Sequence, residues 1–136
     1  MNPIIRNILA VVLGAIIAAA VNMGLIMLGP NIIPAPDGVD PTNMESLKDN
    51  MHLFQAKHFV FPFLAHALGT LAGAFATVKI AVSHHLTLAL IIGAFFILGG
   101  IQMAMQLPSP MWFNVLDIVL AYFPMAYLGH RIASKP

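Results

Sequence analysis

The sequence contains 136 residues, of which 60% are hydrophobic and only 8% are charged, with a formal net charge of +1 and no cysteine. Soluble domains carry about 45–50% apolar and about 25% charged residues, so these few charges cannot cover a water-facing surface and a soluble monomer is excluded. The net charge provides no basic field for nucleic acid, and the lack of cysteine excludes disulfides and cysteine-ligated zinc. The class that remains is a small all-α membrane protein, with a single domain over residues 1–136.

Hydrophobic runs of about 18 or more residues predict membrane-spanning helices. Four such runs occur, over residues of about 8–28, 59–82, 86–107 and 112–130. Short connections between the later runs predict an antiparallel four-helix bundle. The first run also resembles a secretory signal peptide, with Arg6 before the apolar stretch and small residues at its centre. Its continuation to Leu28 favours a helix that stays in the protein.

The distribution of basic residues predicts the orientation, because Lys and Arg favour the cytoplasmic side. With the N-terminus in the cytoplasm, four of the six basic residues lie inside: Arg6, Lys79, Arg131 and Lys135. Only Lys48 and Lys57 then lie outside. The sequence therefore predicts a multi-pass protein of the cell membrane, of the bacterial inner-membrane type, with both termini in the cytoplasm and the loop over residues 29–58 on the non-cytoplasmic side.

The long loop divides into two parts. Residues 29–41 are rich in proline and glycine, which predicts an extended chain. Thr42 and Glu45 then match a capping box, with Thr42 as the N-cap and Glu45 at N3. Apolar residues recur behind them at helical spacing, so a short amphipathic helix is predicted over about 42–56.

Small residues recur every fourth position on the first two predicted spans. The first stripe is Ala10, Gly14, Ala18 and Asn22, and the second is Ala65, Gly69, Gly73 and Thr77. Helices in lipid associate through close packing and hydrogen bonds rather than through hydrophobic burial. We therefore predict that these stripes pack on each other or on a symmetry-related copy.

Each predicted span contributes one polar residue at a similar depth: Asn22, His66, Gln102 and Asp117. At about 1.5 Å rise per residue, these side chains lie about 8–11 Å below the outer boundary. Asp117 is the only acid outside the loop, and an ionisable group inside a membrane needs a partner. His66 is the partner predicted by depth and chemistry, and Asn114 lies one turn from Asp117 on the same face.

This polar layer has two interpretations. In the first, Asp117, His66, Asn114, Asn22 and Gln102 form an outward-facing pocket, capped by the loop helix, that binds or translocates a small polar solute or ion. Four helices rarely enclose a pathway alone, so such a protein is expected to be a homo-oligomer in the lipid bilayer. In the second, the layer only fixes helix packing, in a structural or accessory membrane subunit without a ligand. Neither interpretation needs a cofactor.

A third interpretation is a membrane-embedded, metal-dependent enzyme. Glu45, Asp49 and His52 share a face of the predicted loop helix, with the spacing of a carboxylate–histidine ligand pair. His58 follows at the start of the second span. Thioethers select Cu(I), and seven methionines lie toward the outside: Met23, Met27, Met44, Met51, Met103, Met105 and Met111. The motifs of phosphate-binding loops, GxSxG hydrolases and HExxH metalloproteases are absent, so we favour a non-enzymatic function.

Overall fold

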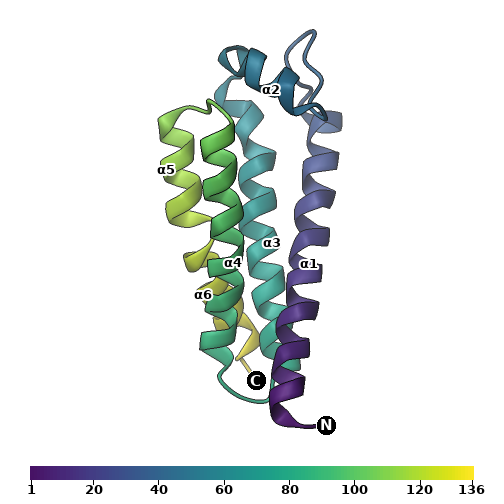
Figure 1. Cartoon of the computed structure of the whole chain (residues 1–136), viewed down its shortest axis with the longest axis vertical. Helices are drawn as coiled ribbons and strands as arrows, with labels where there is room; N and C mark the ends of the chain where they lie inside the picture. Colours follow the sequence, from purple (N-terminus) through teal and green to yellow (C-terminus); the bar gives the residue numbers. More distant parts are fainter.

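Four helical segments are long and apolar enough to cross a membrane, as the sequence predicts. In the computed structural model, which describes residues 1–136, they are α1 (Pro3–Ile32), α3 (Val60–Ile80), α4 (His85–Gln106) and the pair α5 (Met111–Leu120) and α6 (Phe123–Ala133). No strand is present. Both chain termini lie at one end of the molecule, the terminal end, and the short helix α2 (Met44–Asn50) covers the other, the loop end (Figure 1).

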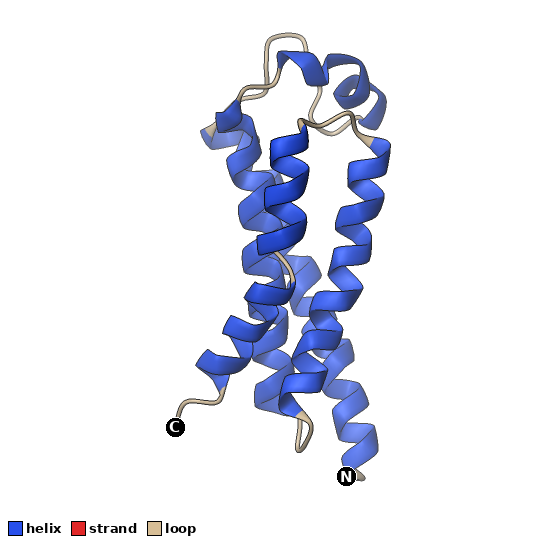
Figure 2. Ribbon diagram, turned by 90° about the vertical axis from the view of Figure 1, so that its left-hand side faces the viewer, coloured by secondary structure: helices blue, strands red, loops and turns tan.

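Helix α3 is the central element. It packs along the length of α1 and has broad contacts with α4 and α6, whereas its contact with α5 and the contact of α1 with α4 are small. Consecutive long segments run in opposite directions between the two ends (Figure 1). The long loop after α1 crosses the loop end before the chain enters α3 (Figure 2).

The two stripes of small residues pack against each other, as predicted. A Cβ atom on Gly73 would lie 2.6 Å from Ala18 Cβ and 2.7 Å from Gly14 O, so the two backbones touch. Thr77 Oγ1 donates to Gly73 O at 2.8 Å and lies 3.3 Å from Ala10 O across the interface. Small side chains allow this approach, and the hydroxyl adds an interhelical contact.

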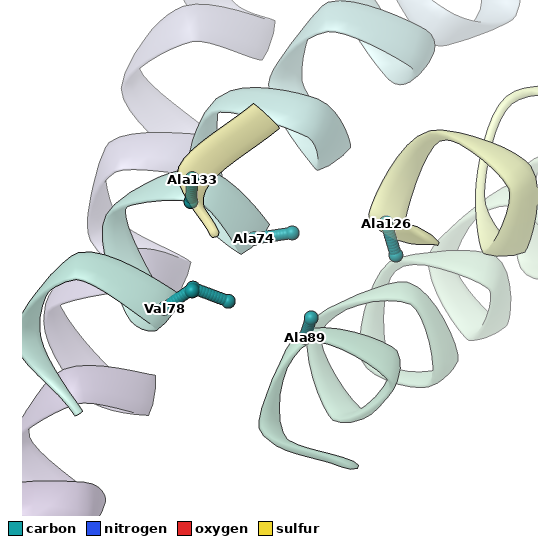
Figure 3. Close-up of a cluster of buried hydrophobic side chains, with 5 residues drawn as sticks. All are labelled: Ala74, Val78, Ala89, Ala126 and Ala133. Atoms are coloured by element: carbon teal, nitrogen blue, oxygen red, sulfur yellow. The ribbon is translucent and has the colours of Figure 1, made fainter. Parts of the chain in front are cut away.

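Small side chains also fill the terminal half of the molecule. One buried cluster joins three helices: Ala74 and Val78 from α3, Ala89 from α4, and Ala126 and Ala133 from α6 (Figure 3). A Cβ atom on Gly129 would lie 2.6 Å from Leu71 O. Helix α6 therefore lies directly on the backbone of α3, and the three helices are in close contact at this end.

Helix α1 is longer than the predicted 8–28 at both ends. It begins at Pro3, where Asn2 Oδ1 caps it by accepting the Ile4 N–H at 2.8 Å. It also continues through Gly29 and Pro30, where the sequence predicts extended chain. Proline is tolerated there because its missing N–H removes only one bond near the helix end, and the Ile33 N–H still bonds Gly29 O.

The fourth span is not the single helix predicted over 112–130. It is interrupted at Ala121 and Tyr122, between α5 and α6, and the interruption is visible as a short loop (Figure 2). Pro124 explains the break, because proline has no N–H for the carbonyl of Leu120 and its ring clashes with that carbonyl. The break leaves Tyr122 in a non-helical conformation with its side chain buried.

The loop helix is also shorter than the predicted 42–56. Helix α2 ends at Asn50, and the chain continues in two short 3₁₀ turns, Met51–Leu53 and Ala56–Phe59. Asn43 rather than Thr42 is the N-cap, since Asn43 Oδ1 accepts the Ser46 N–H at 3.0 Å. Thr42 instead donates its hydroxyl and its N–H to the Asp40 carboxylate. These bonds hold the pKa of Asp40 below its ordinary value of 3.8.

Aromatic side chains anchor the loop to the helices. The ring of Phe59 lies 4.6 Å from that of Phe113 and 5.6 Å from that of Trp112, measured between centroids. Met51 is buried in the same cluster. Such aromatic contacts add about 0.5–1.5 kcal/mol each beyond the buried area, so the loop has a fixed position over the helices.

Candidate ligand-binding site

His66 on α3 and Asp117 on α5 form the polar pair predicted from the sequence. His66 Nδ1 lies 2.8 Å from Asp117 Oδ1 and 3.0 Å from Oδ2. The side chain of Asp117 is 5% exposed and that of His66 is 20% exposed. The bond therefore ties α5 to the central helix and leaves part of the imidazole accessible.

Tyr122 is a third member of this group, which the sequence analysis missed. Its hydroxyl donates to Asp117 Oδ2 at 3.0 Å, and its ring stacks on that of His66 with the centroids 5.8 Å apart. The helix break at Pro124 makes this possible, because Tyr122 follows Asp117 by five residues rather than by a regular helical turn. Gly100 on α4 also helps, since a Cβ atom there would overlap the phenol ring.

These bonds determine which nitrogen His66 presents to its surroundings. A carboxylate only accepts hydrogen bonds, so Nδ1, placed between the two oxygens of Asp117, is the donor. In a neutral imidazole Nε2 is then an acceptor, and it makes no hydrogen bond within the chain. Asp117 and Tyr122 therefore hold an imidazole whose second nitrogen is free for an outside group.

A cavity of about 340 Å³ lies under the loop, bordered by α1, α3, α4 and α5. Four of the five predicted pocket residues line it: Asn22, His66, Asn114 and Asp117. Most of the other lining side chains are apolar, among them Met51, Phe59, Phe61, Met103 and Phe113. Small-molecule sites have this size and this composition, with mainly apolar walls and a few polar groups. We call this space the outer cavity.

Gln102, the fifth predicted pocket residue, is not part of the cavity. Its side chain is exposed on α4, while Gly100 and Met103 of the same helix line the cavity. At 3.6 residues per turn, Gln102 lies about 200° around the helix from Gly100. The depth of Gln102 matches that of the other polar residues, but its direction does not.

A second cavity of about 250 Å³, which is no more enclosed than the outer cavity, is bordered by α1, α3, α4 and the α5–α6 break. It shares four lining residues with the outer cavity: Asn22, His66, Gly100 and Met103. Thr70 and Tyr122 also line it. The hydroxyl of Thr70 is buried within the helices and has no hydrogen-bond partner.

The residues of the predicted metal site do not come together. No three potential metal-ligating carboxylates and imidazoles lie close enough to hold an ion. Glu45, Asp49 and His52 are exposed on the loop, and His58 Nδ1 accepts the backbone N–H of Gln55 at 2.8 Å.

The seven outward methionines fall into two groups. Met23, Met44, Met51 and Met103 line the outer cavity, whereas Met27, Met105 and Met111 are highly exposed. A thioether site for Cu(I) would need several of these sulfur atoms to converge on one point. A Cu(I) site among the four cavity-lining methionines stays a prediction, and methionine also commonly fills gaps in apolar packing.

In comparisons with known proteins, no family model matches this chain, and neither a curated protein nor a solved structure matches it.

Proposed function

We propose that the protein is a membrane-embedded binding protein that takes up a small ligand from its loop side. The hydrogen-bonded pair of His66 and Asp117 in the wall of the outer cavity is the observation that carries this proposal. The four apolar spans support insertion into a cell membrane. The bias of basic residues toward the terminal end favours the loop on the non-cytoplasmic face.

The distribution of space favours binding over passage through a single chain. Both cavities lie at or near the loop half of the molecule, between Asn22, His66 and Met103. The terminal half is filled by the alanine-rich cluster around Ala74 and Ala89. A solute in the outer cavity would therefore meet close-packed helices beyond it, and translocation would need a second conformation or a second copy of the chain.

A structural subunit without a ligand is the second candidate. Both oxygens of Asp117 are bonded within the chain, by His66 and Tyr122, and interhelical hydrogen bonds often serve only to fix packing. The two functions differ in one respect that can be measured. A binding protein needs an outer cavity that water and solutes enter from the loop side, whereas a purely structural polar group needs no such access.

Cysteine labelling tests this difference, because the chain has no native cysteine. In vesicles with the loop outside, Met103→Cys is expected to react with a membrane-impermeant methanethiosulfonate reagent. Gln102→Cys, at the same depth but outside the cavity, is the matched control. The reagent reacts with the thiolate form of cysteine. An apolar surrounding raises the thiol pKa, and each unit of that increase lowers the thiolate fraction, and with it the labelling rate of Gln102→Cys, about tenfold.

Protection of both cysteines from the reagent would contradict ligand entry and favour the structural subunit. Equal labelling of both would also contradict it, since the cavity would then offer no access beyond that of the lipid-facing surface.

A further inference from the structure

One face of α4 points away from the rest of the molecule and carries a polar side chain among apolar ones. Gln102 is exposed on this face, and its amide makes no hydrogen bond within the chain. Hydrocarbon offers an amide no partner, so a free amide within a membrane span is unfavourable. Gln102 therefore points to a partner outside the chain.

Gln102 lies inside the span rather than at its edge. It comes four residues before Gln106, where α4 ends, which is about 6 Å along the helix axis. The Cα–Cβ bonds of a helix lean toward its N-terminus, and the N-terminus of α4 is at the terminal end of the molecule (Figure 1). The side chain of Gln102 therefore starts out toward the middle of the span, away from the headgroups on the loop side.

The residues around Gln102 form a continuous outward face with the spacing of a helix–helix seam. Between Ile91 and Gln106, every residue within about 60° of Gln102 around the helix is exposed: Ile91, Phe95, Leu98, Gly99, Met105 and Gln106. Five positions of this face, 91, 95, 98, 102 and 105, follow one another at alternating intervals of four and three residues. This repeat is the one along which two helices interdigitate in a coiled coil. The opposite face of α4, which includes Ile92 and Gly93, is buried within the chain.

A second copy of the chain supplies the partner that this face needs. Copies inserted in the same direction hold their α4 helices parallel, so a twofold axis along the membrane normal brings each residue of the face opposite its own counterpart at the same depth. An amide both donates and accepts, so two Gln102 side chains satisfy each other. A single polar residue in such a seam also fixes the register of the two helices. Gly99, on the same face, adds no side chain that would keep the two backbones apart.

Resting on the proposed membrane insertion but not on a ligand, we infer that the protein forms a parallel homodimer through the outward face of α4. Reciprocal hydrogen bonds between the two Gln102 amides join the copies. The neighbouring spans present no such group. At the same distance from the loop end, α1 exposes Leu28 and α5 exposes Val115, and lipid surrounds these apolar side chains without any hydrogen bond being lost.

Disulfide crosslinking tests the surface, because the chain has no native cysteine. In liposomes that contain the full-length protein at a low protein-to-lipid ratio, Leu98→Cys is expected to give a crosslinked dimer when it is oxidised with copper phenanthroline. Val119→Cys is the matched control. Both positions lie eight residues from the loop end of their helices, and the native side chains are 66% and 58% exposed. If Leu98→Cys crosslinks no better than Val119→Cys, the proposed surface is wrong.

Gln102→Leu tests the amide without removing a hydrogen bond from the fold. Dimerisation is followed by energy transfer between dyes attached to Ser134→Cys, in the exposed C-terminal segment, as the protein is diluted in lipid. Loss of the reciprocal hydrogen bonds is expected to weaken the dimer about 3- to 30-fold. Gln106→Leu, at the end of the helix, is the control and is expected to change the affinity by less than about twofold. Unchanged affinity in Gln102→Leu would overturn the role of the amide.

The same liposomes distinguish this inference from the proposed function. Protein that alkaline carbonate strips from the vesicles would contradict the proposed membrane insertion itself. Inserted protein that stays monomeric at every dilution would contradict the dimer alone, and labelling of Met103→Cys decides separately whether the outer cavity admits solutes.

Discussion

Replacement of Asp117 by leucine is expected to destabilise the protein by about 2–5 kcal/mol. The substitution leaves the part-buried Nδ1–H of His66 and the buried hydroxyl of Tyr122 without an acceptor, and a buried unsatisfied group costs about 1–3 kcal/mol. The measurement is reversible unfolding in mixed micelles, followed by circular dichroism. Asn114→Leu is the control, because Asn114 is one turn away on α5 and makes only a 3.5 Å contact to Ser109 O.

A variant that removes all three polar side chains together shows whether the fold requires them. In the triple substitution His66→Phe, Asp117→Leu and Tyr122→Phe, no polar atom remains without a partner. Removal of all partners of a buried polar group is often nearly neutral, so most of the lost stability is expected to return. Wild-type stability in Asp117→Leu alone would contradict the three hydrogen bonds described for this site.

The second large effect is expected at the contact between α1 and α3. A Cβ atom on Gly14 would overlap Thr77 Oγ1 and lie 2.7 Å from Gly73 O, and a backbone carbonyl cannot move aside as a flexible side chain can. Gly14→Ala is therefore expected to cost about 1–3 kcal/mol, the range for overpacked cores. The same unfolding measurement applies.

Gly24→Ala provides the matched comparison on the same helix. A Cβ atom on Gly24 has no neighbour within 4 Å, so this variant is expected to lie within about 0.5 kcal/mol of the wild type or to gain slightly from alanine's higher helix propensity. If Gly14→Ala is no less stable than Gly24→Ala, the close contact described between α1 and α3 would be wrong.

Features that depend on composition or on regular spacing could be predicted from the sequence. Continuous apolar runs identify the four spans, because the hydrocarbon core demands them. The stripes through Gly14 and Gly73 identify the α1–α3 contact, since residues four apart share a helix face. Depth and complementary chemistry together pair His66 with Asp117, even though 51 residues separate them.

Features that depend on direction or on a local break could not be found by depth alone. Gln102 has the correct depth, but its side chain is on the exposed face of α4, a distinction that requires the helix to be placed against its neighbours. Tyr122 reaches Asp117 only because Pro124 interrupts the helix. Pro124 was a signal for this break, but the new direction of Tyr122 depends on the space that Gly100 leaves.

The presence of a helix in the long loop could be predicted from the sequence, but its first residue and its N-cap could not. A helix with an acidic first turn is present, yet it starts after Asn43 because the Asp40 carboxylate binds Thr42. Two side chains with similar capping ability compete at this point, and the turn geometry before them decides between the two. The aromatic contacts of Phe59, which fix the loop over the cavity, join segments distant in sequence.

Water contact at His66 is the most direct test of a free imidazole nitrogen facing an open cavity. Water-edited solid-state NMR of the protein in bilayers is expected to transfer magnetisation from water to His66 Nε2, and to transfer little to Ala74 and Ala89 in the close-packed terminal half. A His66 ring as dry as these two alanines would contradict the ligand-binding site.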